Sequence, residues 1–349
     1  MNRRRYVVAF APGIVALALA AACRGGGDYQ EPAGPSNVIV FGARTAEGRY
    51  GLYSVRPDGT DLERLSGEQQ FAFFPRWSPS GSRVAYIVRA EGDEGAGTLR
   101  VFDFETGSAT TVSEQALPSD AGPAASWSPD GWRLAFAETS GGGRVRVYDV
   151  GRRELLDDSE IAGTTPDWSP TDEDALAFAA PAGDETDLRA AQPNGDDART
   201  LLERPGIEGD PRWSPDGRFL AFWSAPVDGP PRLFVLEIES GDMRELAGGQ
   251  GAAWSPEAAR IAYTGPTAAG GGNREIYVVP AAGGATEALT QSVTVDTWPS
   301  WSPRGDAIAY LAIVDRQTSF LCVAQLDPRG GDCLNLPGLT PSAPAWSPR

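Results

Sequence analysis

The stretch PRWSPDGRFLAFWS, from Pro211 to Ser224, joins a tight turn to a strand and decides the fold of this chain. Within it, Pro215 presets φ at the second turn position, and Gly217 accepts a positive φ without steric cost. The run of aromatic and aliphatic residues that follows is typical of a short strand. The unit is predicted to have four antiparallel strands: the segment carrying Trp213, residues 219–223, residues 232–237 and a last one ending near residue 246.

The Trp-Ser-Pro tripeptide of this stretch occurs seven times along the chain, 41 to 50 residues apart. Repetition at such a period indicates a repeat architecture in which each unit is one supersecondary element. Four-stranded units that cannot bury a face alone are stabilised by radial packing, so we predict an all-β fold of the β-propeller class. Because tryptophan recurs in every unit, we assign these seven side chains to the structural core: Trp77, Trp127, Trp168, Trp213, Trp254, Trp301 and Trp346.

The two ends of the repeat region complement each other. The first unit begins at Val38 with its second strand, and residues 344–349 supply a Trp-Ser-Pro strand without the rest of a unit. Pairing of the two fragments would leave no exposed sheet edge, which favours a closed ring over a solenoid. We therefore predict seven blades over residues 37–349, with the ring closed by the C-terminal strand.

The repeat resembles the WD40-like (PD40) repeat of TolB-type propellers, in which Pro-x-Trp-Ser-Pro-Asp-Gly precedes Ile-Ala-Phe and Ile-Tyr-Val. Asp216-Gly217 preserves the turn of that pattern, whereas Glu257-Ala258 and Thr171-Asp172 replace it, and there we expect different turns. The resemblance leaves six blades as the alternative to seven. It implies an exported, lipoprotein-type chain that contacts envelope lipoproteins or segments of membrane proteins.

The N-terminus is typical of an export signal. Arg3, Arg4 and Arg5 precede an apolar stretch that ends in small residues, so residues 1–22 are predicted to be a signal peptide. Cys23 follows directly and resembles the acceptor of a lipoprotein processing site; ordinary cleavage beside an incidental cysteine is the alternative. The segment 23–36, rich in glycine and proline, is predicted to be a flexible tether. We expect a periplasmic or cell-surface location, with the membrane reached only through a lipid anchor.

The charge of the chain limits its partners. Its formal net charge is −17, with 30 basic residues against 47 acidic ones. Such a surface repels nucleic acid and anionic membranes, so we expect no nucleic-acid partner and a chain that works as a monomer.

Two further cysteines, Cys322 and Cys333, flank the predicted hairpin turn of the last complete blade. They face each other across two strands in this prediction, and an exported compartment favours their oxidation to a disulfide; two buried thiols are the alternative.

The catalytic inventory of the sequence is small. It contains no histidine, and all thirty of its basic residues are arginine. This removes Ser-His-Asp and Cys-His catalysis, His-ligated zinc and lysine nucleophiles. Acidic pairs such as Asp172-Glu173 and Asp196-Asp197 do not form a loop of alternating oxygen ligands, so they are interpreted as solvated turn residues. We expect no catalytic residues, no metal and no cofactor, with calcium as the remaining possibility.

The segments that precede each tryptophan are expected to ring one mouth of the central channel. Arginines and aromatics are the residue types that dominate binding hot spots, so we predict that this mouth binds a partner. Padding between neighbouring blades is the alternative for the three aromatics. The candidate partner-binding residues are Phe73, Phe74, Arg76, Asp167, Asp210, Arg212 and Trp298.

These observations favour a non-enzymatic, extracytoplasmic scaffold that binds a protein or peptide segment in the cell envelope. One alternative is a calcium-dependent, lactonase-like hydrolase that works in the propeller channel with carboxylates alone. Another is a carbohydrate- or small-ligand-binding propeller, in which Trp298 would stack on a sugar ring.

Overall fold

The computed structural model describes residues 34–349, with gaps at 91–94, 118–124, 140–142, 157–160, 173–174, 227–228 and 268–272. All regular secondary structure in these residues is β-strand. No helix within them has the length and apolar character needed to cross a membrane. The predicted signal peptide, Cys23 and most of the predicted tether lie outside the described residues, as does Glu173.

The described strands form seven successive groups of four, together with the short additional strand β12 (Ile161–Ala162). Blade 1 contains β29 (Leu339–Trp346), β1 (Ile39–Thr45), β2 (Tyr50–Val55) and β3 (Glu63–Glu68). Blade 2 contains β4 (Phe71–Trp77), β5 (Arg83–Arg89), β6 (Gly97–Asp103) and β7 (Ser108–Ala116). Blade 3 contains β8 (Ala125–Trp127), β9 (Arg133–Glu138), β10 (Arg144–Asp149) and β11 (Glu154–Leu155). Within each of these blades the strands pair in an antiparallel manner.

The remaining four blades follow the same order. Blade 4 contains β13 (Thr164–Trp168), β14 (Leu176–Ala182), β15 (Glu185–Ala191) and β16 (Arg199–Leu202). Blade 5 contains β17 (Ile207–Trp213), β18 (Phe219–Ala225), β19 (Arg232–Glu237) and β20 (Met243–Gly248). Blade 6 contains β21 (Gln250–Trp254), β22 (Arg260–Pro266), β23 (Arg274–Pro280) and β24 (Glu287–Ala288). Blade 7 contains β25 (Val295–Trp301), β26 (Ala307–Ile313), β27 (Ser319–Leu326) and β28 (Arg329–Cys333).

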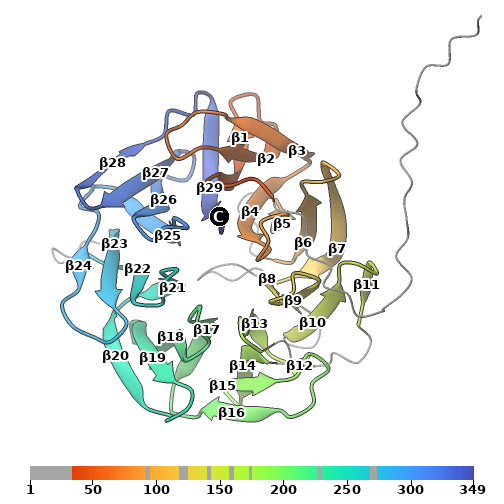
Figure 1. Cartoon of the computed structure of the whole chain (residues 1–349), viewed down its shortest axis with the longest axis vertical. Coiled ribbons are helices and arrows are strands. Elements are labelled where there is room, and N and C mark those ends of the chain that lie inside the picture. Colours follow the sequence, from red (N-terminus) through yellow and green to blue (C-terminus); the bar gives the residue numbers. More distant parts are fainter. Residues whose placement is uncertain are drawn as a thin grey trace, which may run out of the picture. The chain divides into compact units, whose positions relative to one another are not determined.

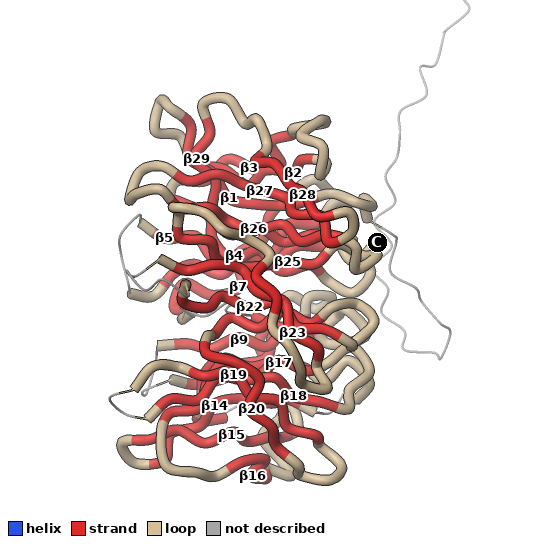
Figure 2. The backbone as a smooth tube through the Cα atoms, turned by 90° about the vertical axis from the view of Figure 1, so that its left-hand side faces the viewer, coloured by secondary structure: helices blue, strands red, loops and turns tan. Residues whose placement is uncertain are grey.

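The blades of residues 34–349 are arranged radially around a central channel (Figure 1). The strands that carry the repeated tryptophans, β4, β8, β13, β17, β21, β25 and β29, lie nearest the centre. In side view the strands run between two faces, at which the connecting loops gather (Figure 2). The predicted all-β propeller class is confirmed, and the strand groups of the described residues agree with seven blades.

Residues from the two ends of the repeat region close the ring, as predicted. Strand β29 pairs antiparallel with β1, and Ile39 lies opposite Trp346 in the register. The Trp346 indole donates to Asn37 Oδ1 at 3.1 Å, and the Val38 N–H donates to Ser347 Oγ at 3.1 Å. A single apolar cluster contains Ile39 and Trp346 together with residues of blade 7, so the closure is a packed interface as well as a strand ladder.

The repeated tryptophans pack against the blade before their own, and four of them also form a hydrogen bond to it. Four indole N–H groups donate to the backbone carbonyl of the residue that precedes the tryptophan of the previous blade, at 2.9–3.0 Å. The donors and acceptors are Trp77 to Ala345, Trp127 to Arg76, Trp254 to Arg212 and Trp301 to Ala253. Six of the seven rings are buried, at 3–8% exposure, whereas Trp254 is partly exposed although it packs against the core. The assignment of these side chains to the structure agrees with the prediction.

The turn after each tryptophan tolerates more sequence variation than we expected. Gly217 has φ +70° and its N–H donates to the Ser214 carbonyl at 2.8 Å. Ala258 occupies the equivalent place with φ +58°, and its N–H donates to the Ser255 carbonyl at 2.9 Å. The prediction of a different turn at Glu257-Ala258 is therefore wrong, because the alanine adopts the left-handed conformation at a steric cost that the surrounding ladder offsets.

At Thr171-Asp172 the turn does differ, as predicted. The hydrogen bond that closes it runs from the Ser169 N–H to the Ala175 carbonyl, which makes it one residue longer than the bond from Ser214 to Phe219.

Cys322 and Cys333 lie directly opposite each other on β27 and β28 and are joined by a disulfide. The bond lies inside blade 7, next to the closure, and crosses one hairpin only.

One part of the predicted tether belongs to the packed ring. A Cβ on Gly34 would lie 1.6 Å from the Gly81 carbonyl oxygen, so the chain at Gly34 packs directly against the turn of blade 2. Packing on the ring therefore includes residue 34, which lies before the boundary at residue 37 that we predicted.

The ring closure gives a first prediction. Trp346→Ala should lower the free energy of unfolding by about 3–5 kcal/mol, because it removes a buried ring that packs across the closure. Phe320→Ala in the neighbouring blade is the matched control, since Phe320 is 45% exposed and should cost less than about 1 kcal/mol. Urea unfolding followed by circular dichroism measures both. Equal losses in the two variants would contradict the closure.

Candidate functional site

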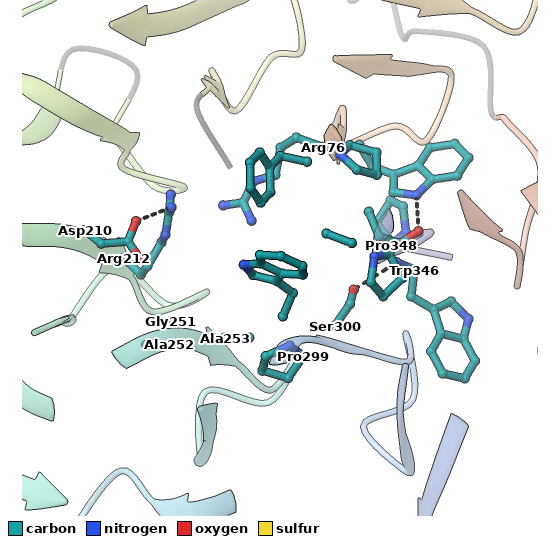
Figure 3. Close-up of a pocket in the computed structure, with 17 residues that line it drawn as sticks. Arg76, Asp210, Arg212, Gly251, Ala252, Ala253, Pro299, Ser300, Trp346 and Pro348 are labelled. Carbon is teal, nitrogen blue, oxygen red and sulfur yellow. Dashed lines mark hydrogen bonds and ion pairs between the residues drawn. The ribbon is translucent and has the colours of Figure 1, made fainter. Parts of the chain in front are cut away.

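The inner strands bring most of the predicted partner-binding residues to one cavity of about 240 Å³ in the central channel. Its lining includes Phe74, Arg76, Asp210, Arg212 and Trp298, from β4, β17 and β25 (Figure 3). An adjoining cavity of about 370 Å³ is lined by Asp167, Arg76 and Arg212. Residues about 90 to 220 positions apart in the sequence therefore meet in the channel.

Phe73 is the exception among the predicted site residues, because it does not line either cavity. Its ring centroid lies 4.7 Å from that of Phe71, and the Arg89 guanidinium covers it at 5.3 Å. The contacts of this side chain lie within blade 2, which is neither partner binding in the channel nor the padding between neighbouring blades given as the alternative.

A local break in the inner strands exposes particular side chains to the channel. The ladder between the first two strands of blades 2, 4, 5, 6 and 7 shifts register two or three residues before the tryptophan. The residue three positions before the tryptophan has a positive φ of 47–70° in each of these blades. These residues are Phe74, Thr165, Asp210, Gly251 and Trp298, and all except Thr165 line the 240 Å³ cavity. The position relative to the tryptophan was the sequence signal that marks them.

Asp167 connects four blades. Its Oδ1 accepts from Ser126 Oγ at 3.1 Å and from the guanidinium groups of Arg76 and Arg212 at 3.4 Å each. Its Oδ2 accepts from the Trp213 N–H at 2.8 Å. The side chain is 6% exposed, so these donors replace water as its hydrogen-bond partners.

Arg212 is neutralised within the protein. Its guanidinium binds Asp210 and also contacts Asp167, and both Arg212 and Asp210 are almost completely buried (Figure 3). Burial acts to lower the pKa of Arg212, but the charges of Asp210 and Asp167 outweigh it and the net direction is upward. Burial raises the pKa of Asp210 more than the Arg212 charge lowers it.

Asp167, Asp210 and Arg212, which were predicted to bind a partner at the channel mouth, are buried. They lie in the channel lining, where water has little access, and there Arg212 of β17 pairs with both Asp210 of β17 and Asp167 of β13.

Arg76 differs from Arg212 in its surroundings. Its side chain is 37% exposed and, within the described part of the chain, makes one ion pair, the 3.4 Å contact with Asp167. Burial, followed by the charge of Arg212, lowers the pKa of Arg76.

Two aromatic rings from different blades meet beside Arg76. Phe74 and Trp298 pack edge to face, with ring centroids 5.4 Å apart. Phe74 is buried, whereas Trp298 is partly exposed. Among the predicted site residues that line the channel cavities, Trp298 and Arg76 are therefore the two whose side chains remain accessible.

The described residues contain no group of three or more His, Cys, Asp or Glu side chains placed to hold a metal ion. In the channel, Asp167 and Asp210 both face arginine rather than each other. The expectation that no metal or cofactor is bound remains a prediction.

Strand β17 also carries a buried carboxylate that the sequence analysis missed. Glu208 is 1% exposed, and its Oε1 accepts from Ser224 Oγ at 2.8 Å and lies 3.7 Å from Arg204. Its Oε2 has no hydrogen-bond partner among the described residues. Burial raises the pKa of Glu208 above 4.5, and the nearby charges of Asp187 and Glu185 add to the rise.

The radial blades, the seven tryptophan strands and the lined channel define a β-propeller of four-stranded WD40-like repeats. The family model described as the TolB beta propeller domain (PD40) matches residues 126–349, and the chain belongs to this family.

A TolB homolog of Chlorobium luteolum is 33% identical over 120 residues, which is 34% of this chain and 27% of that protein. The chain thus spans about a quarter of the length of this curated relative. The crystal structure of TolB from Acinetobacter baumannii superposes with a TM-score of 0.61 at 18% identity, over 90% of this chain and 67% of that one. An oligogalacturonate lyase from Vibrio parahaemolyticus gives a TM-score of 0.61 at 15% identity, over 84% and 92%. At such identities the two structures show the fold alone.

The hydrogen-bond and ion-pair network around Asp167 gives a second prediction. Asp167→Asn keeps an oxygen for the Trp213 N–H but removes the charge that faces Arg76 and Arg212. We expect a loss of about 3 kcal/mol in the free energy of unfolding, because a buried ionic network loses one partner. Asp61→Asn is the control, since the Asp61–Arg56 pair is exposed and should matter by less than about 1 kcal/mol. Urea unfolding measures both, and similar losses would argue against the network.

Glu208 gives a prediction of pH dependence. Because the pKa of Glu208 is raised in the folded state, its contribution to the free energy of unfolding is fully present below pH 4.5. That contribution is lost as the pH rises through the folded pKa. Glu208→Gln removes the titrating group and therefore that loss. The free energy of unfolding of the variant, relative to that of the wild type, should rise by about 1 kcal/mol from about pH 4 to about pH 8. Urea midpoints at the two pH values measure it. The exposed Glu63→Gln should show no such gain, and a pH-independent difference for Glu208→Gln would refute the assignment.

Proposed function

We propose that this protein is a non-enzymatic scaffold of the cell envelope that binds a protein or peptide segment at the mouth of its propeller channel. Membership of the TolB beta propeller family supports a propeller that works through binding. The observation that carries the proposal is the accessible pair of Trp298 and Arg76 in a cavity whose other charges neutralise each other.

The remaining features are consistent with this role. Aromatic and arginine side chains supply most of the binding energy in protein interfaces, and here one of each remains accessible in the same cavity. We further propose export to the periplasm or cell surface and anchoring through Cys23, as the N-terminal sequence predicts.

Site-specific photocrosslinking tests the proposal. A benzophenone side chain placed at position 298 of the full chain, in cells that express it natively, should form an adduct with one defined envelope protein. The same group at position 320, which is 45% exposed in blade 7, is the control and should not form that adduct. The adduct should disappear when Arg76 is also replaced. Adducts that are equal at both positions, or absent at position 298, would count against the channel mouth as the binding site.

A further inference from the structure

The two arginines in the lining of the channel cavities are not equivalent. Arg212 has two carboxylate partners, Asp210 and Asp167, and its side chain is 5% exposed. Arg76 has one, and its side chain is 37% exposed. One guanidinium is therefore part of the protein's own ion-pair network, and the other faces the open cavity.

The single partner of Arg76 is weakly held. The contact of 3.4 Å is longer than the usual 2.7–2.9 Å of a charge-assisted hydrogen bond, and it reaches an oxygen that also accepts from Ser126 and Arg212. A guanidinium has five N–H donors arranged as a planar fork, so most of the donors of Arg76 have no acceptor among the described residues. The lowered pKa of Arg76 has the same origin, because burial and Arg212 disfavour its charge more than Asp167 favours it.

We propose that Arg76 binds a single carboxylate of a peptide segment that enters the channel, while Trp298 and Phe74 contact the adjoining part of that segment. This inference rests on the proposed function and names the chemistry of its ligand. A carboxylate is the planar acceptor that a guanidinium fork binds through two parallel hydrogen bonds. Trp298 lines the same cavity as Arg76, so a short segment can contact both.

Size and charge favour one carboxylate over a polyanion. The cavity of about 240 Å³ that Arg76 shares with Trp298 has room for a side chain or a chain end, and the rest of the segment can continue into the adjoining cavity of about 370 Å³, which Arg76 also lines. The net charge of −17 repels a ligand with many negative charges, and of the two arginines that line the cavity Arg76 is the one without a close carboxylate contact, since it reaches Asp167 only at 3.4 Å. An acidic side chain and a free C-terminus offer the same carboxylate chemistry.

Peptide selection on the full chain separates these two sources. One random-heptapeptide library displays free C-termini, and a second displays the heptapeptides internally, so that only side chains offer a carboxylate. An acidic side chain predicts enrichment of Asp or Glu in both libraries. A chain end predicts enrichment in the first library alone. Arg152→Met, an exposed arginine outside the channel, is the matched control and should select the same peptides as the wild type.

Affinities of the selected peptide then test the pairing itself. Arg76→Met should weaken binding at least about tenfold, and neutralising the peptide carboxylate should weaken binding to the wild type by a similar factor. Neutralising it should have little further effect on Arg76→Met, because the two changes remove one interaction. Arg76→Lys keeps the charge without the planar fork and should be intermediate. Thermal melts of each variant verify folding.

The outcomes distinguish the inference from the proposed function. If peptides bind in a manner that Trp298→Ala abolishes but Arg76→Met leaves unchanged, the carboxylate assignment is wrong and the peptide-binding mouth stands. If the effects of the two neutralising changes add independently, the carboxylate binds elsewhere and the inference falls. If neither library yields a peptide whose binding needs Trp298, the proposed function fails together with the inference.

Discussion

The packing of each repeated tryptophan ring against the apolar residues of the previous blade is the interaction on which the ring depends. It fixes where each blade meets its neighbour, and at four of these junctions the indole N–H also donates to an inner-strand carbonyl of the previous blade. A single blade has two apolar faces and cannot bury either alone, so the interaction has to repeat until the ring closes. At the closure, Trp346 donates instead to Asn37, from the other end of the described chain.

The residue before each tryptophan joins its blade to the next one in one of two ways. Arg76, Arg212, Ala253 and Ala345 use the backbone carbonyl, which accepts from an indole N–H and leaves the side chain free to vary. Ser126, Asp167 and Ser300 use the side chain, which accepts from the backbone N–H of the tryptophan in the next blade at 2.8–2.9 Å. The side chains of Arg76 and Arg212 cannot accept, and they place a positive charge in the channel instead. Variation in the site is therefore possible without loss of the ring.

The sequence was sufficient to predict the class of fold, the tryptophan core and the pairing of Cys322 with Cys333, because each depends on spacing along one repeat. It was not sufficient to predict the burial of Asp167 and Arg212. Their exposure depends on which charged groups from different blades meet, and Asp167 and Arg212 are 45 positions apart. The positive φ at Ala258 was missed for a related reason, since the ladder around a turn can impose a conformation that the residue itself disfavours.

Three residues before the tryptophan, the ring requires a backbone conformation with positive φ, whereas the side chain at that position is available to the site. Gly251 adopts a positive φ there at little cost, which shows that the ring needs the conformation and not a side chain. Phe74, Asp210 and Trp298 adopt it at a cost of about 1–3 kcal/mol each. Asp210 offsets that cost through its pair with Arg212. Trp298 is partly exposed, and the contact with Phe74 covers only part of its ring. The presence of a tryptophan rather than a glycine at position 298 is therefore best explained by the surface that its side chain presents to the channel.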